Sequence, residues 1–191
     1  MAVLSLTADL EARQRFAQQV EAEAGTEVRA CYQCGKCSGG CPISFAMDYQ
    51  PRQIMRLVQL GLKDRALGSS TIWLCASCHT CTTRCPRGVK IAETMDALRH
   101  LAWREGYKPR EERIAKFHSI FLDSLRKGGR LGEVGLVGGF KLATGDYFSD
   151  LNLGRKLFSQ GKLKLASHHI HNPQAVARIF QRVREKEGAK R

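Results

Sequence analysis

Eight cysteines dominate the chemistry that this 191-residue sequence could perform. They form two rows, CYQCGKCSGGCP at residues 31–42 and CASCHTCTTRCP at residues 75–86, and none lies elsewhere in the chain. In each row the thiols follow the spacing C-x2-C-x2-C-x3-C, and a proline follows the last cysteine. Two rows of one spacing, with no cysteine left over, predict two similar centres that need thiolate ligands.

The spacing is typical of ferredoxins with two 4Fe–4S clusters, in which the fourth cysteine of each row binds the other row's cluster. Three closely spaced cysteines can surround one part of a cluster, whereas the fourth cannot easily turn back onto it. We therefore expect crossed ligation, with a relay of single electrons between two neighbouring clusters. The predicted ligands are Cys31, Cys34, Cys37 and Cys85 for cluster 1, and Cys75, Cys78, Cys81 and Cys41 for cluster 2.

Other residues in and beside the rows are expected to shape the surroundings of the clusters. The prolines stiffen the chain after each fourth cysteine and lack an N–H donor, whereas glycines let the backbone approach sulfur closely. The histidine in the second row could donate a hydrogen bond to sulfur or instead face solvent or a partner. We expect Trp73 and Tyr32 to pack beside the clusters and shield them. The residues assigned to the cluster environment are Pro42, Pro86, Gly35, Gly39, Gly40 and His79.

Zinc and disulfide bonds are the alternatives for these cysteines. Structural zinc sites generally use two C-x2-C pairs some distance apart, whereas each row here adds a third and a fourth cysteine close by. Structural disulfides belong to oxidising compartments. The start of the sequence, MAVLSLTADLEARQRF, has no basic region followed by an apolar stretch that would act as a secretory signal. The expected location is therefore the cytoplasm, and iron–sulfur clusters are favoured over both alternatives.

Apolar residues recur with helical periodicity before, between and after the rows, and no segment shows the alternation of a strand. The predicted class is therefore all-α. Residues 128–145 are rich in glycine and are expected to be irregular. Helices are predicted over 7–24 (with Thr7 as N-cap and Gly25 at the end), from Pro51 to about residue 60, and over 63–67, 89–106, 110–127, 151–163 and 173–190.

The formal charge of +13 is spread unevenly, with a net charge of +3 over residues 1–105 and +10 over residues 106–191. An excess of this kind can reflect a solvated surface, an acidic protein partner or nucleic acid. No nucleic-acid motif accompanies the charge, so we do not expect nucleic acid as a partner. His168, His169 and His171 are expected to form a surface or interface turn rather than a metal site.

Several other functions find no support in the sequence. No apolar run approaches the roughly 18–20 residues that a membrane-spanning helix needs. There is no glycine-rich phosphate loop after a strand and no spacing that marks a nucleophile with its base. We therefore expect no membrane span and no catalytic site of the chain's own.

The rows, together with the intervening YQPRQIMRLVQLGL and TIWLC segments, resemble HdrC, an iron–sulfur subunit of heterodisulfide reductase, over residues 27–107. The resemblance implies an α-helical ferredoxin fold, as in the iron–sulfur subunits of succinate dehydrogenase and fumarate reductase. It implies electron relay between a flavin-containing subunit and a disulfide-reducing subunit. The substrate of that complex in methanogens is the mixed disulfide of coenzyme M and coenzyme B, and bacterial relatives use related acceptors. Such complexes can also join a nickel–iron hydrogenase or a formate dehydrogenase and bifurcate electrons at the flavin.

These inferences predict three segments. Residues 1–26 are an N-terminal helix, residues 27–107 are a two-cluster α-helical ferredoxin domain, and residues 108–191 are a basic helical extension for subunit docking. The predicted function is that of the electron-transfer subunit of an oxidoreductase complex. A free-standing dicluster ferredoxin serving other oxidoreductases is the alternative, although a shuttle of that kind has little need of a long helical extension.

Overall fold

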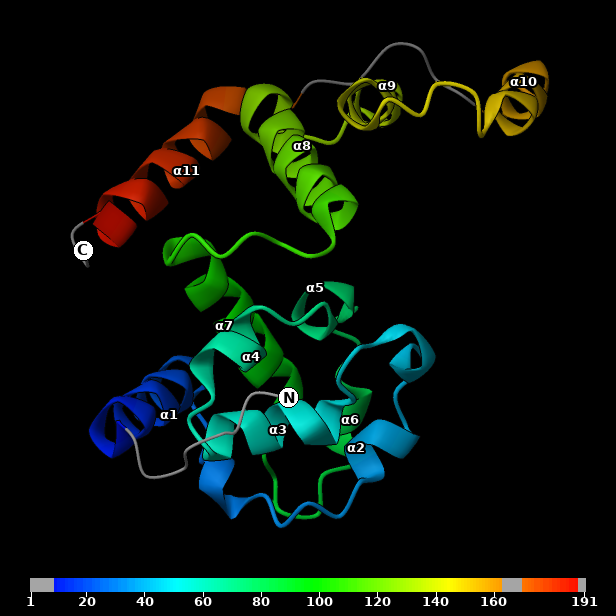
Figure 1. Cartoon of the computed structure of the whole chain (residues 1–191). Coiled ribbons are helices and arrows are strands. Elements are labelled where there is room, and N and C mark those ends of the chain that lie inside the picture. The colour runs from blue at the N-terminus through cyan, green and yellow to red at the C-terminus, as the bar shows by residue number, and fades with distance from the viewer. Residues whose placement is uncertain (1–8, 163–169, 189–191) are drawn as a thin grey trace. The chain divides into compact units, whose positions relative to one another are not determined.

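The computed structural model describes residues 9–162 and 170–188, and every regular element within them is a helix (Figure 1). The predicted all-α class is therefore confirmed. The expected N-cap Thr7 and the histidines His168 and His169 lie outside the described residues. The elements are α1 (Leu10–Ala24), η1 (Val28–Ala30), α2 (Lys36–Gly39), η2 (Ser44–Ala46), α3 (Pro51–Gln59), α4 (Lys63–Leu67), α5 (Thr71–Leu74), α6 (Thr80–Thr83), α7 (Ile91–Arg104), α8 (Glu112–Gly128), α9 (Glu133–Thr144), α10 (Leu151–Ser159) and α11 (Pro173–Gly188).

The chain separates into two compact units, residues 1–112 and residues 113–191. Both cysteine rows lie in the first unit. There α1 packs against α7, and α3 packs against α1 and α4. The functional division into segments 1–26, 27–107 and 108–191 stays a prediction, since α1 belongs to the same compact unit as the cysteine rows.

Helix α7 is central to the core of the first unit. Its inward face repeats every three or four residues, as an amphipathic helix requires, and burying that face supplies most of its stability. Helix α3 begins with Pro51 in its first turn, as predicted, and the side chains of Gln50 and Gln53 cap its first backbone N–H groups reciprocally. The almost fully buried side chains of these helices and of α1 are Ile91, Met95, Leu98, Leu101, Ile54, Met55, Val58 and Val20.

In the second unit, the prediction that residues 128–145 are irregular is wrong. Helix α9 occupies Glu133–Thr144. Its Leu136 is buried, and the ring of Phe140 meets Phe117 of α8 edge-on, with 5.7 Å between the ring centroids. Packing of this apolar face offsets the low helix propensity of the glycines in the segment, a tertiary effect that residue-by-residue propensity does not capture.

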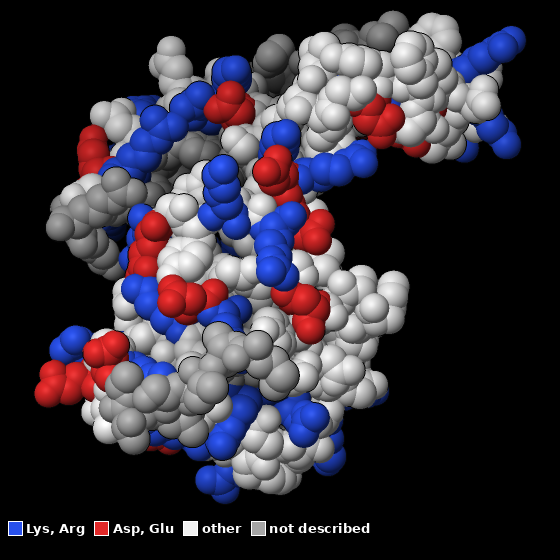
Figure 2. Space-filling model, viewed as in Figure 1, with Lys and Arg blue, Asp and Glu red and all other residues white. Residues whose placement is uncertain are grey.

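The charges of the second unit are largely paired rather than gathered into one field. Lys141 lies 2.9 Å from Asp150, Arg113 lies 3.1 Å from Asp146, and Arg126 lies 2.6 Å from Asp123. On the face shown in Figure 2, acidic side chains stand among the basic ones. Among the described residues, no helix is both long and apolar enough to cross a membrane.

Candidate metal centre

The two cysteine rows share one backbone conformation. The residue before the second cysteine is left-handed in both, with φ of 66° at Gln33 and 48° at Ser77. The residue after it is left-handed too, with φ of 82° at Gly35 and 58° at His79. A left-handed residue other than glycine costs about 1–3 kcal/mol and persists where the surrounding structure enforces it, often at functional sites. Successive N–H groups in such turns form concavities that bind anionic groups, iron–sulfur clusters among them.

The third cysteine of each row lies on a short helix, and these two helices pack together. Cys37 lies on α2 and Cys81 on α6, and α2 contacts α6 (Figure 1). Burial raises the pKa of Cys81 to about 11, and the thiols of Cys75 and Cys37 raise it further. The two rows therefore approach one another at their third cysteines.

All eight cysteines are free thiols, and their exposure follows their place in the row. The second cysteine of each row, Cys34 or Cys78, is exposed, whereas Cys37 is buried. The remaining five are intermediate. Each row thus presents one thiol outward and turns another toward the partner row.

Polar groups next to the cysteines are aimed at sulfur. Burial raises the pKa of Cys37, and the backbone N–H and the hydroxyl of Ser38 oppose that rise. Burial likewise raises the pKa of Cys75 against the opposing N–H of Ser77. The hydroxyl and N–H of Thr80 lower the pKa of Cys78. Donors placed in this way favour a negatively charged sulfur, which is the form that binds iron.

Each row is attached to the start of the long helix that follows it. The hydroxyl oxygen of Ser38 accepts a 3.0 Å hydrogen bond from the backbone N–H of Arg52, the second residue of α3. The hydroxyl oxygen of Thr82 accepts a 3.0 Å bond from the N–H of Ala92, the second residue of α7. Each hydroxyl therefore caps an N–H that has no partner within its helix.

Seven residues farther along each helix, a side chain returns to the row. The amide nitrogen of Gln59 donates to the carbonyl oxygen of Cys31 at 2.7 Å and to that of the residue three positions earlier at 3.1 Å. The guanidinium of Arg99 donates to the carbonyl oxygen of Cys75 at 3.0 Å and to that of the residue three positions earlier at 2.9 Å. The first cysteine of each row is thus held by an equivalent contact.

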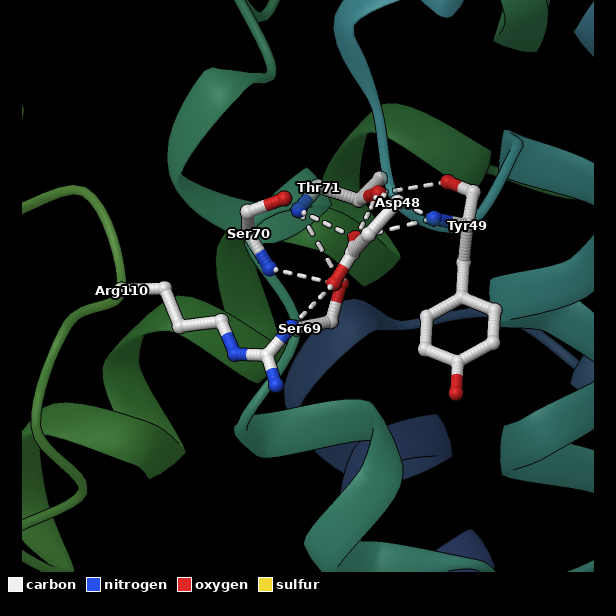
Figure 3. A network of polar contacts seen from close by, with 6 residues as sticks. All are labelled: Asp48, Tyr49, Ser69, Ser70, Thr71 and Arg110. Atoms are coloured by element: carbon white, nitrogen blue, oxygen red, sulfur yellow. Dashed lines mark hydrogen bonds and ion pairs between the residues drawn. The ribbon is translucent and has the colours of Figure 1, made fainter.

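A carboxylate joins the segment after the first row to the segment that leads into the second (Figure 3). Burial would raise the pKa of Asp48, but hydrogen bonds from the N–H of Ser70 and from the Thr71 and Ser69 side chains hold that pKa well below its ordinary range. The network therefore fixes the distance along the chain between the rows. The donors to the carboxylate are the Ser69 hydroxyl at 2.9 Å, the Ser70 N–H at 3.0 Å, the Thr71 N–H and hydroxyl at 3.1 and 2.8 Å, the Tyr49 N–H at 2.9 Å and the Arg110 guanidinium at 3.4 Å.

The structure places two of the expected environment residues in particular surroundings. A side chain at Gly40 would collide with the guanidinium of Arg84, only 2.7 Å from the position of its Cβ, so the glycine makes room for that arginine. The Nδ1 atom of His79 lies 3.7 Å from a carboxylate oxygen of Glu93. Neither observation tests the expected contacts with sulfur, which stay predictions. Pro42, Pro86 and Gly39 are exposed, and Gly35 is partly exposed.

The two aromatic residues expected to shield the clusters differ. Trp73 is buried, 4% exposed, and packs against Trp103 with 6.3 Å between ring centroids. Tyr32 is 61% exposed, so the expectation that it packs in the interior is wrong. It follows Cys31 in a loop whose backbone faces solvent, and that loop offers no apolar neighbour to cover the ring.

Sequence reasoning missed the residues that attach the rows to the helices. Ser38 and Thr82 lie at the same offset of 44 residues as the cysteines, so aligning the two rows could have found them. Gln59 and Arg99 are 40 residues apart, because the connectors before α3 and α7 differ in length, and such an alignment would not pair them. Asp48 carries no sequence signal that separates it from an ordinary loop carboxylate.

The donor set fits iron–sulfur clusters. Within residues 9–162 and 170–188, no group of three or more His, Cys, Asp or Glu side chains converges as a single-ion site would require. The four cysteines of a 4Fe–4S cluster bind four different irons, so they need not converge in that way. The free thiols, the paired concavities and the N–H groups aimed at sulfur are what such a cluster needs.

A helical unit with two cysteine loops of this kind defines a dicluster iron–sulfur protein, and comparison with known proteins agrees. The family described as "4Fe-4S dicluster domain" matches residues 27–89. The chain is 47% identical over 100 residues to HdrC, the iron–sulfur subunit of the CoB–CoM heterodisulfide reductase of Methanopyrus kandleri, which covers 52% of each chain. It is 34% identical over 129 residues to HdrC of the H(2):CoB-CoM heterodisulfide,ferredoxin reductase of Methanothermobacter marburgensis, which covers 62% of this chain and 70% of that one.

A third relative, HdrC of the ferredoxin:CoB-CoM heterodisulfide reductase of Methanosarcina mazei, is 37% identical over 112 residues, 54% of this chain and 68% of its own. The chain belongs to the HdrC family of heterodisulfide reductase iron–sulfur subunits. The predicted resemblance and the two 4Fe–4S clusters are thereby confirmed. The matched region spans about half the length of the Methanopyrus relative, so the activity, substrates and partners of the whole assembly are treated as proposals below.

Proposed function

We propose that the chain relays single electrons through two neighbouring 4Fe–4S clusters between partner subunits of a heterodisulfide-reductase-type complex. The observation that carries the proposal is the pairing of the cysteine rows. They share one backbone conformation, they approach at α2 and α6, and each exposes its second cysteine. A 4Fe–4S cluster, when bound, accepts and releases one electron at a time.

The ligand sets are those of crossed ligation, with Cys41 completing the second row's set and Cys85 completing the first row's set. Two neighbourhoods support this assignment. Burial raises the pKa of Cys75, and the Cys41 thiol is among the groups that raise it further. Desolvation raises the pKa of the Tyr32 phenol, and the thiols of both Cys34 and Cys85 raise it further. Each fourth cysteine therefore has a neighbour that belongs to the other row.

Electrons enter and leave at the two exposed thiols, Cys34 and Cys78, because these positions bring a ligand sulfur to the surface. The buried third cysteines line the passage between the rows. The backbone N–H groups of the left-handed turns hold the negative charge of each centre without bringing water into it.

The proposed partners are a flavin-containing subunit and a disulfide-reducing subunit, in some assemblies with a hydrogenase or formate dehydrogenase. The terminal acceptor is the CoM–CoB heterodisulfide or, in a bacterial setting, a related acceptor. The names of the relatives, which mention heterodisulfide and ferredoxin, support this setting. The eight reduced thiols support a reducing compartment, and we place the protein in the cytoplasm.

A cavity next to the first row offers a docking place for an acidic partner surface. Its volume is about 640 Å³, and Arg13, Arg29 and Arg56 line it together with Cys31. Complementary charge of this kind speeds and orients association with an acidic protein surface. Replacing Arg56 by Glu should weaken binding to the flavin-containing and disulfide-reducing partners, whereas the same change at Arg15, which lies on α1 outside the cavity lining, should not. Equal loss in both variants would argue against docking at this cavity.

Anaerobic purification with analysis of iron and acid-labile sulfide tests the relay itself. We expect about eight irons per chain, four for each cluster. Stoichiometric zinc, or about four irons, would contradict the two-cluster assignment. A stable complex with a flavoprotein and a disulfide-reducing protein supports the subunit role. A monomer that passes electrons to unrelated oxidoreductases would instead favour a free-standing ferredoxin.

A further inference from the structure

The two halves of the ferredoxin unit are built as a repeat, and one position in that repeat differs in charge. A row hydroxyl holds the second residue of the following helix in both halves, at 3.0 Å in each. Seven residues on, Gln59 in the first half and Arg99 in the second bind the same pair of backbone carbonyls relative to the first cysteine. The two side chains occupy one structural role, but Gln59 is neutral and Arg99 carries a full positive charge.

The charge of Arg99 is well placed to act on its row. Its side chain is 18% exposed, so solvent screens it less than it screens the surface arginines. Guanidinium remains protonated at all accessible pH values. Through Nη2 it reaches the carbonyl of Cys75 at 3.0 Å, and among the charges that act on the Cys75 thiol, its effect exceeds that of Asp96.

The counter-charge is Asp96, one turn earlier on α7. Its carboxylate lies 3.0 Å from Nη1 of Arg99 and accepts a 3.1 Å bond from the Ser77 hydroxyl. The carboxylate is 38% exposed, twice as exposed as its partner, so it offsets the arginine only in part. In the first half, the corresponding Gln59 oxygen accepts from Arg56 at 3.2 Å, but Arg56 is exposed to solvent.

We propose that Arg99 is a positioning residue that raises the reduction potential of the cluster held by Cys75, Cys78 and Cys81. A one-electron reduction adds negative charge to that centre, and a nearby buried cation stabilises the added charge. An electron shared by the two clusters is thereby biased toward the second row. The inference rests on the proposed function, because it requires one cluster at each row.

The test is a potentiometric titration of the purified, cluster-loaded protein, followed by electron paramagnetic resonance. Arg99→Gln copies the side chain of the first half and keeps donors for the carbonyls. We expect it to shift one of the two cluster potentials to a more negative value and to leave the other unchanged. The shifted signal should be the one that Cys78→Ser alters. Arg104→Gln, which removes a charge from the same helix but has no contact with either row, should move neither potential.

Two further variants give the sign of the effect. Arg99→Lys keeps the charge and should restore most of the potential, whereas Asp96→Asn removes the counter-charge and should shift the same cluster to a more positive value. If Arg99→Gln fails to retain both clusters, this pair still decides the matter. Unchanged potentials in Arg99→Gln, or in Asp96→Asn where Arg99→Gln cannot be loaded, overturn the proposal. A wild-type protein with fewer than about eight irons would contradict the two-cluster function instead.

Discussion

The half of the ferredoxin unit that contains the first cysteine row and α3 can be compared directly with the half that contains the second row and α7. The backbone is the same in both, down to the left-handed residues on either side of the second cysteine. The attachment to the following helix is the same too, through one hydroxyl and one long polar side chain. What is repeated is therefore the geometry that binds a cluster, and what differs is the chemistry placed around it.

The halves also differ in the length of the connector between the row and its helix. Residues 42–50 lead from the first row to α3, whereas residues 86–90 lead from the second row to α7. The longer connector holds Asp48, which binds the start of α5 just ahead of the second row. The extra length in the first half thus provides the joint between the halves, and the predictions below take the pair apart from the largest expected effect to the smallest.

The largest effect concerns the fourth cysteines, because they are where the halves exchange ligands. With crossed ligation, Cys41→Ser should alter the same cluster signal as Cys78→Ser, and Cys85→Ser the same signal as Cys34→Ser. Loss of one cluster would lower the iron content from about eight to about four per chain. Paramagnetic resonance of the four variants compares the pairs without any prior assignment of signals. If Cys41→Ser matches Cys34→Ser instead, each row binds its own cluster.

The second effect concerns the joint. Asp48→Asn removes the charge from a carboxylate that accepts several hydrogen bonds and whose side chain is 23% exposed. We expect the unfolding free energy to fall by about 2–3 kcal/mol, measured as the denaturant midpoint of cluster loss under anaerobic conditions. Asp9→Asn is the matched control, since Asp9 lies at the exposed start of α1, where no side-chain cap forms.

The pH dependence of that difference has a definite sign. Hydrogen bonding lowers the pKa of Asp48 below its ordinary value of 3.8. A depressed pKa contributes stability that is fully present above 3.8 and is lost as the pH falls toward the folded-state pKa. The gap between wild type and Asp48→Asn should therefore stay constant at neutral pH and narrow only below 3.8. A gap that narrows already near pH 6 would assign the effect to another group.

The sequence was sufficient for the parts of the molecule that depend on local pattern. Cysteine spacing predicted two clusters, and proline and apolar periodicity predicted α3 with Pro51 in its first turn. The outcome differed where contacts distant in sequence decide. Helix α9 forms in spite of its glycines because Phe140 packs on α8, and Tyr32 stays exposed because nothing covers its loop.

The contacts that hold the rows in place were beyond prediction for a related reason. Gln59 reaches back 28 residues to Cys31, and Arg99 reaches back 24 residues to Cys75. Neither side chain differs in type from the ordinary polar residues of an exposed helix face. Only the folded arrangement shows that they bind equivalent carbonyls, and only their equivalence reveals the difference in charge.

The third effect concerns the hydroxyls that cap α3 and α7. Ser38→Ala and Thr82→Val each remove the acceptor for a helix N–H and should each lower the unfolding free energy by about 1–2 kcal/mol. Thr82→Val should cost more, because the Thr82 hydroxyl also donates to Glu93 at 3.0 Å. Denaturant midpoints of cluster loss would measure both, with Thr83→Val as a control, since the Thr83 hydroxyl donates only to the carbonyl oxygen of His79 in the turn before it. A larger loss in Ser38→Ala than in Thr82→Val would contradict the equivalence of the two caps.

The smallest effect concerns the left-handed residue after the second cysteine, which is Gly35 in one half and His79 in the other. Gly35→Ala places a Cβ no closer than 3.8 Å to its nearest neighbour, so its cost is conformational and should be about 1 kcal/mol. His79→Gly relieves the same strain in the second half. Its lost pairing with Glu93 is worth little, because His79 is 52% exposed. We therefore expect the two variants to shift the denaturant midpoint of cluster loss in opposite directions. If His79→Gly lowers the midpoint as much as Gly35→Ala does, then His79 stabilises the second row through contacts that outweigh its backbone strain, and the two halves differ in how they hold this turn.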